Sequence, residues 1–140
     1  MLDVVRTRRR IANWPVKRLL GLGVPIPNTY MMTVTGRNTG KRHTIPLTLV
    51  EYDGYRHLVG TRGEVNWVQN VRAAGQLTLS RGRMYEILPV TELEPDQAAP
   101  VIRKFTNEVP LSGRLMKVSP DASLQEFEQA ARRHPVFRLG

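Results

Sequence analysis

The strongest candidate for chemistry in this 140-residue chain is a basic, glycine-containing segment at residues 36–44, GRNTGKRHT. Its two glycines permit backbone angles that other residues avoid. Around them, Arg37, Lys41, Arg42 and His43 supply hydrogen-bond donors that suit phosphate or carboxylate oxygens. The spacing alone leaves two interpretations open, an anion-binding loop between strands and a solvated turn.

A second candidate lies at residues 61–70, TRGEVNWVQN, where a loop leads into a helical pattern. Asn66 and Asn70 are one turn apart on one helix face, and Trp67 projects to a neighbouring face. These side chains could line a pocket for a planar aromatic ligand. The alternative, which these residues alone favour slightly, makes Asn66 a helix cap and Trp67 a core residue.

Other kinds of chemistry find little support in the sequence. The segment 36–44 is one residue short of a nucleotide-binding P-loop, and the strand pattern after it leaves no helix to point amides at phosphate. The three histidines lack metal-ligand spacing, so we expect no metal site. No serine lies in a Gly-x-Ser-x-Gly elbow, and no complete dinucleotide fingerprint is present.

Composition is that of an ordinary globular protein, with 41% hydrophobic residues and no apolar run near the roughly 20 residues that cross a bilayer. The chain has no cysteine, which suits a reducing cytoplasm. Its formal net charge of +9 is concentrated in residues 1–42, which contain nine Lys or Arg and one Asp. This charge favours an anionic partner, such as a phosphorylated ligand, a membrane surface or nucleic acid.

Hydrophobic patterning predicts the elements that position these residues. Within a single domain of residues 1–140, we expect a basic amphipathic helical segment and a Pro/Gly linker at residues 1–27. Strands are predicted at 30–35, 45–52, 55–60, 77–80, 84–93 and 136–139, and helices at 65–74, 95–109 and 124–132. Antiparallel strands with only a few helices indicate an α+β protein with a small closed or half-closed barrel.

Four segments, in their order and spacing, resemble the deazaflavin-dependent nitroreductase family: TVTGRNTG at 33–40, Pro46, VGTRG at 59–63 and NWVQNVRA at 66–73. The resemblance covers about residues 28–102. It implies a mainly antiparallel split β-barrel, related to FMN-binding proteins, with a few packing helices. It also implies coenzyme F420, a deazaflavin with a phosphate and a glutamate tail, rather than FMN.

The resemblance further implies which residues hold this cofactor. One group would hold the phosphate and tail, and its members are Arg37, Asn38, Thr39, Gly40, Lys41 and His43, the last standing where the family usually has arginine. A second group would border the deazaflavin rings, and its members are Pro46, Thr61, Arg62, Gly63, Asn66, Trp67 and Asn70. No tyrosine lies within residues 106–119, where relatives close the substrate pocket, so no proton donor is assigned.

The activity implied by the resemblance is hydride transfer from the reduced deazaflavin to a small, lipophilic, electron-poor acceptor, such as a quinone, an enone or a nitro compound. Two alternatives stay open, a non-catalytic F420 carrier and a basic module that binds membranes or nucleic acid. For the reductase we expect a cytoplasmic location, no nucleic-acid partner, and a homodimer as one form of assembly. Residues 1–22 either pack on the barrel or contact the inner membrane face peripherally.

Overall fold

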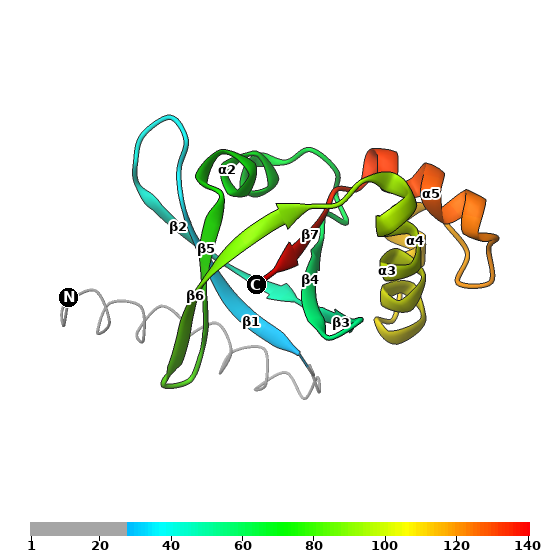
Figure 1. Cartoon of the computed structure of the whole chain (residues 1–140), viewed down its shortest axis with the longest axis horizontal. Helices are drawn as coiled ribbons and strands as arrows, with labels where there is room; N and C mark the ends of the chain where they lie inside the picture. The colour runs from blue at the N-terminus through cyan, green and yellow to red at the C-terminus, as the bar shows by residue number, and fades with distance from the viewer. Residues whose placement is uncertain (1–27) are drawn as a thin grey trace.

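The computed structural model describes residues 28–140, which form a curled antiparallel sheet accompanied by helices (Figure 1). The sheet order is β2-β1-β5-β6-β7-β4-β3. The strands are β1 (Thr29–Thr35), β2 (Arg42–Thr48), β3 (Val50–Tyr52), β4 (Tyr55–Val59), β5 (Gln76–Arg81), β6 (Met84–Glu92) and β7 (Val136–Leu139). The helices are α2 (Asn66–Ala74), α3 (Pro95–Glu108), α4 (Ser112–Met116) and α5 (Leu124–Arg133). The helical segment and linker predicted at residues 1–27 lie outside the described residues.

The sheet curls because its two edge strands, β2 and β3, follow each other directly in the chain. Within the described residues these two edges pair with β1 and β4 and not with each other. Buried apolar side chains from β1, β4, β5 and β7, among them Met32, Leu58 and Leu79, meet in one core cluster inside the curl. The arrangement confirms the predicted α+β split β-barrel.

The hairpin of β1 and β2 carries the basic segment in its loop. Thr33 lies opposite Thr44 in the register, and their hydroxyl oxygens are 2.8 Å apart. The strand predicted at residues 45–52 is wrong in its bounds, because β2 begins at Arg42 and the chain divides into β2 and β3 at Leu49. Leu49 is buried and donates its N–H to Asn28 O at 2.8 Å, which ends the ladder with β1.

Strand β2 has β1 on one side and no other described strand on its other side. Pro46 lies in the middle of β2, opposite Met31, and is exposed. Because proline has no N–H, this edge offers one hydrogen-bond donor fewer than an ordinary strand would.

Helix α2 closes the end of the barrel nearest the β1–β2 loop (Figure 1). Val68 and Val71 enter the same core cluster as the strands, and both are fully buried. The helix ends at Gly75, whose φ of 72° is left-handed and whose N–H donates to Val71 O at 3.0 Å. The predicted glycine cap is therefore confirmed, since glycine adopts this conformation without steric cost.

Helices α3 and α5 pack together beside the sheet and form a second core cluster around Ile102, Phe105 and Phe127. The helix α4 was not predicted from the sequence. It has five residues, which is too few to show helical periodicity, and Leu111 and Lys117 flank it in left-handed conformations. Among α2 to α5, none is long and apolar enough to cross a membrane.

The start of β7 anchors the turn that follows β4. Gly60 donates its N–H to Pro135 O at 2.7 Å, and its carbonyl accepts a hydrogen bond from His134 Nδ1 at 2.9 Å. His134 is buried, and this burial lowers its pKa, with a smaller contribution from the charge of Arg133. Burial likewise lowers the pKa of His57 in β4. Both imidazoles are therefore held neutral in the folded protein.

Acidification should destabilise this arrangement. The folded-state pKa values of His134 and His57 lie below the unfolded value of about 6.5, so the unfolded chain gains protons first as the pH falls. We expect full stabilisation above about pH 6.5 and a loss below it, with a slope of at most about 1.4 kcal/mol per pH unit for each histidine. Urea unfolding between about pH 7.5 and about pH 5.5 measures this slope. The His134→Gln variant should show a shallower slope, and an unchanged slope would contradict the assignment.

Candidate functional site

The β1–β2 loop is a compact turn held by its own backbone. Gly36 donates its N–H to Lys41 O at 2.7 Å, and Gly40 donates to Gly36 O at 3.0 Å. Gly40 has a φ of 71°, and Thr39 Oγ1 accepts the Lys41 N–H at 3.2 Å. The His43 ring lies over Gly36, where a Cβ would come within 2.7 Å of His43 Nε2. The glycines therefore serve the geometry of this loop, as the sequence predicts.

Arg37 joins this loop to the first turns of α2. Asn70 Oδ1 accepts both the Arg37 backbone N–H at 3.1 Å and a guanidinium N–H at 2.7 Å. The same guanidinium lies 3.4 Å from Asn66 O and 3.4 Å from Asn66 Oδ1. Asn70 is buried, so these hydrogen bonds satisfy an amide oxygen that would otherwise be costly to bury. The two segments singled out in the sequence thus meet in the structure.

Asn66 is not the N-cap of α2, so the cap interpretation of this residue is wrong. Val65 is the N-cap, with no side-chain cap, and Asn66 is the first helical residue with its amide turned to Arg37. Trp67 is half-buried and packs against the barrel core cluster, which agrees with the core interpretation. Trp67 directly follows Asn66, the residue that Arg37 contacts, and part of its side chain stays exposed.

Residues 60–65 form a tight turn beside α2. Gly63 donates its N–H to Gly60 O at 3.0 Å and accepts the N–H of Val65 at 2.9 Å. Gly63 has a φ of 82°, and a Cβ there would lie 3.2 Å from Arg133 O. Thr61 and Arg62 therefore sit on a segment whose backbone is fixed, with Arg62 exposed and Thr61 half-buried.

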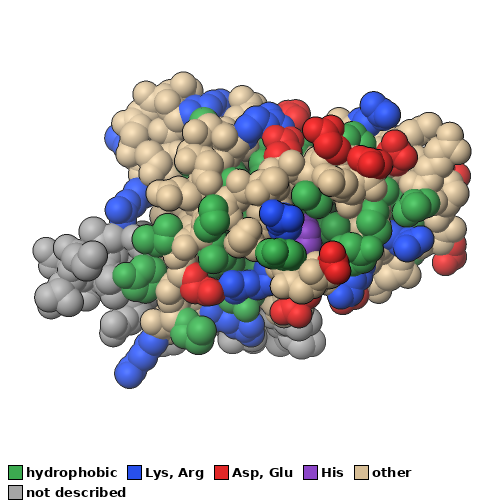
Figure 2. Space-filling view, in the orientation of Figure 1, with side chains coloured by type: hydrophobic (Ala, Val, Ile, Leu, Met, Phe, Trp, Pro, Cys, Tyr) green, Lys and Arg blue, Asp and Glu red, His purple; other side chains and the backbone are tan. Residues whose placement is uncertain are grey.

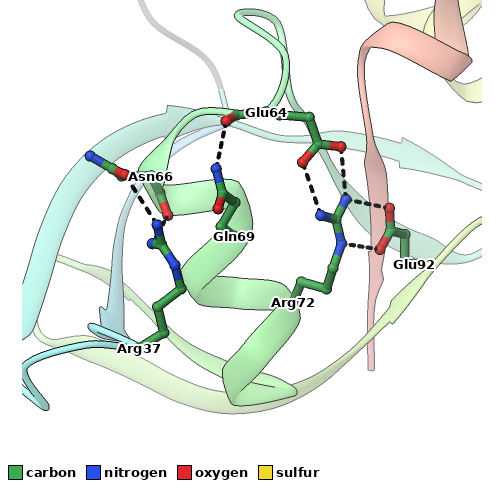
Figure 3. A network of polar contacts seen from close by, with 6 residues as sticks. All are labelled: Arg37, Glu64, Asn66, Gln69, Arg72 and Glu92. Atoms are coloured by element: carbon green, nitrogen blue, oxygen red, sulfur yellow. Dashed lines mark hydrogen bonds and ion pairs between the residues drawn. The ribbon is translucent and has the colours of Figure 1, made fainter.

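An ion-pair network lies at the far side of α2, and sequence patterns do not predict it because its three members are separated in the chain. Arg72 binds Glu64 through two hydrogen bonds of 2.9 and 3.0 Å and Glu92 through two more of 2.7 and 2.9 Å. Gln69 Nε2 also donates to Glu64 O at 2.9 Å (Figure 3). The Arg72 guanidinium lowers the pKa of Glu64, and the two carboxylates raise the pKa of Arg72.

The cationic side chains of the site are available to a ligand. Within residues 28–140, the side chains of Lys41, Arg42 and Arg62 make no hydrogen bond or ion pair. Glu64, two residues from Arg62 in the chain, is already engaged by Arg72. Figure 2 shows Lys and Arg side chains at the upper left, around the β1–β2 loop and α2, with acidic side chains gathered to their right. This donor set fits an anionic ligand.

A pocket of about 470 Å³ opens beside the loop but covers only part of the predicted site. It is lined by Gly36, Arg37 and Arg42 together with the end of α2 and the neighbouring strands β1, β5 and β6. Residues 61–67 do not line it, and neither does Pro46. The structure therefore joins the loop to Asn66 and Asn70 directly, whereas no described contact connects Pro46 with them.

Comparison with known proteins bears on this site. The chain resembles a solved structure described as an F420-H2 dependent reductase (FDR-A), at 22% identity and a TM-score of 0.58, covering 84% of this chain and 100% of the other. A structure described as a domain-swapped dimer has 21% identity and a TM-score of 0.57, covering 99% and 98%. A protein of the pyridoxinephosphate oxidase family from Clostridium acetobutylicum, related to general stress protein 26, has 9% identity and a TM-score of 0.53, covering 88% and 79%.

At these identities the likeness to solved structures shows the fold alone. No curated protein matches the chain. The sequence model of one family, described as F420H(2)-dependent quinone reductase, matches residues 7–120. This match covers most of the chain and includes the β1–β2 loop and α2. It confirms the resemblance to F420-dependent reductases, and the chain belongs to the F420H(2)-dependent quinone reductase family.

Proposed function

We propose that this F420-dependent reductase transfers a hydride from reduced F420 to a small quinone, with enones and nitro compounds as further acceptor classes. The description of its family supports the quinone class. The observation that carries the proposal is the set of bonds from Arg37 to Asn66 and Asn70, which holds a cationic loop against the first turns of α2. When bound, F420 supplies the hydride chemistry, so the protein's own residues bind, orient and exclude water.

The loop residues fit the cofactor's phosphate and glutamate tail. Lys41 offers a charge without a partner among the described residues, and the backbone of Thr39 and Gly40 is fixed around it. Arg37 contributes a positive charge whose position α2 determines. We assign Asn38 and His43 to the same group, because both are exposed in or beside this turn. A donor that is already held in place, as Arg37 is, binds an anion with a smaller loss of side-chain freedom.

The second group would border the rings. Asn66, Trp67 and Asn70 come from α2, Thr61, Arg62 and Gly63 from the turn before it, and Pro46 from β2. Among them, Thr61 and Arg62 carry side-chain donors that no other described residue engages. We assign to these two donors the stabilisation of negative charge that develops on the acceptor, since preorganised donors are effective in this role.

The loop assignment predicts a charge-dependent loss of affinity. Lys41→Ala should raise the Kd for F420 about tenfold at low salt, because it removes a hydrogen bond to a charged group. The remaining affinity should depend less on salt. Fluorescence titration of F420 at two salt concentrations measures both effects. The matched control is Arg83→Ala, which removes one positive charge from the exposed turn between β5 and β6. Equal loss in both variants would contradict a specific role for the loop.

The activity itself is tested by two linked measurements. We expect saturable binding of oxidised F420 and weaker or no binding of FMN, followed under the same conditions. Anaerobic mixing of the protein with reduced F420 and a soluble quinone should then give catalysed oxidation of the cofactor. Binding without oxidation by a quinone, an enone or a nitro compound would favour the carrier alternative. Absence of F420 binding by folded protein would overturn the reductase.

We also propose a homodimer. The relative described as a domain-swapped dimer supports it, because the two chains cover each other almost completely. Sedimentation velocity should then give twice the mass of the chain, whereas a monomer at micromolar concentration would contradict it.

Contact of residues 1–22 with a membrane and a cytoplasmic location stay predictions from the sequence.

A further inference from the structure

We propose that Arg72 is a positioning residue for the cofactor site: by binding Glu64 it fixes the turn at residues 61–64 and keeps the Glu64 carboxylate away from the cations of the site. The inference rests on the proposed function. Figure 3 shows the arrangement, in which Arg37 approaches α2 from one side while Glu64 and Arg72 meet on the other.

The turn has two points of attachment, one at each end. At the first end, Gly60 is bonded to Pro135 and His134. At the second end, Glu64 is bonded through its carboxylate to Arg72 and through its carbonyl to Gln69. The side chains of Thr61 and Arg62, between these ends, make no hydrogen bond to other described residues. Hydrogen bonds within the turn hold its backbone, and the two ends attach the turn to the rest of the protein. Arg72 supplies the side-chain contact at one of these ends.

The geometry requires an arginine. Arg72 uses Nη1 and Nη2 for Glu64, and Nε and Nη2 for Glu92, so a single planar group serves two carboxylates. Lysine has one ammonium and cannot form both forks. These ion pairs are partly exposed, but exposed pairs contribute to stability mainly when they are bidentate and form a network, as here.

The pairing also has an electrostatic consequence for the site. Glu64 follows Gly63 directly and is two residues from Arg62, whose guanidinium has no partner among residues 28–140. If Arg72 were absent, the Glu64 carboxylate would be free to pair with Arg62 and to repel an anionic ligand. Glu92 lies in β6, outside the turn, and binds Arg72. The group of Glu64, Arg72 and Glu92, here called the clamp, therefore also connects the site to the sheet.

Hydrogen exchange on protein without cofactor tests the positioning directly. In Arg72→Met, the amides of residues 61–65 should exchange about fivefold faster or more than in the wild type, while core strands exchange as before. Arg132→Met, which removes an ion pair of 3.9 Å on α5, is the control and should leave these amides unchanged. If Arg72→Met does not fold, Arg72→Lys serves instead, since it keeps the charge and loses the forks. Wild-type exchange of residues 61–65 would overturn the clamp.

Affinity for F420 tests the electrostatic part. Arg72→Met should raise the Kd about fivefold or more, and Arg72→Met/Glu64→Gln should recover part of this loss, because the free carboxylate is gone while the turn stays loose. Glu92→Gln keeps the fork to Glu64 and should bind nearly as the wild type. A double variant no tighter than Arg72→Met would overturn the charge effect. Absence of F420 binding by the wild type would instead refute the proposed function, with the exchange result still deciding the clamp.

Discussion

A single buried oxygen, Asn70 Oδ1, connects the parts of this molecule that matter most for its chemistry. It accepts two hydrogen bonds from one residue, the backbone N–H and the guanidinium of Arg37. Asn70 is adjacent to Val71 and two residues from Val68, both of which fill the barrel core. The position of the β1–β2 loop is therefore set by the packing of α2, and a shift of the helix would move the loop with it.

The charges near α2 are distributed in two distinct ways. On the side of the loop, cations stand without partners in the described part of the chain, and only Arg37 is committed to amide oxygens. On the opposite side, one guanidinium serves two carboxylates. Because Glu64 and Glu92 are both engaged there, their carboxylates do not pair with the cations on the side of the loop.

Much of the fold could be predicted because local residue chemistry agrees with the tertiary structure. Asp53 and Gly54 both have positive φ, as the two-residue turn between β3 and β4 requires. The sequence does not reveal the division at Leu49, because residues 45–52 are rich in β-branched and aromatic residues throughout. In the structure Leu49 is buried in the barrel core cluster and the next residue, Val50, in the cluster around Ile102. Residue patterns in a sequence reflect neighbours along the chain, whereas the break between β2 and β3 depends on packing against residues that are distant in the sequence.

The candidate site shows the same limit. Glycines and basic residues marked the loop, and the helical spacing of Asn66 and Asn70 placed them on one face. Their actual partner, Arg37, lies 33 residues from Asn70, and hydrophobic periodicity carries no information about such a pair. The interpretation of Asn66 as a cap failed for this reason, since its amide satisfies a guanidinium from another segment instead of its own helix.

In the described part of the chain, β2 is one of two edge strands of the sheet, and its outer side pairs with no other strand. Such edges invite strand addition and, at high concentration, aggregation. In β2 the proline at position 46 interrupts the row of donors, and Arg42 places a charged side chain at the loop end of the strand. Strand β2 also contributes Arg42 to the pocket beside the β1–β2 loop, so one short segment both limits β-pairing at the edge of the sheet and supplies a cation to the pocket.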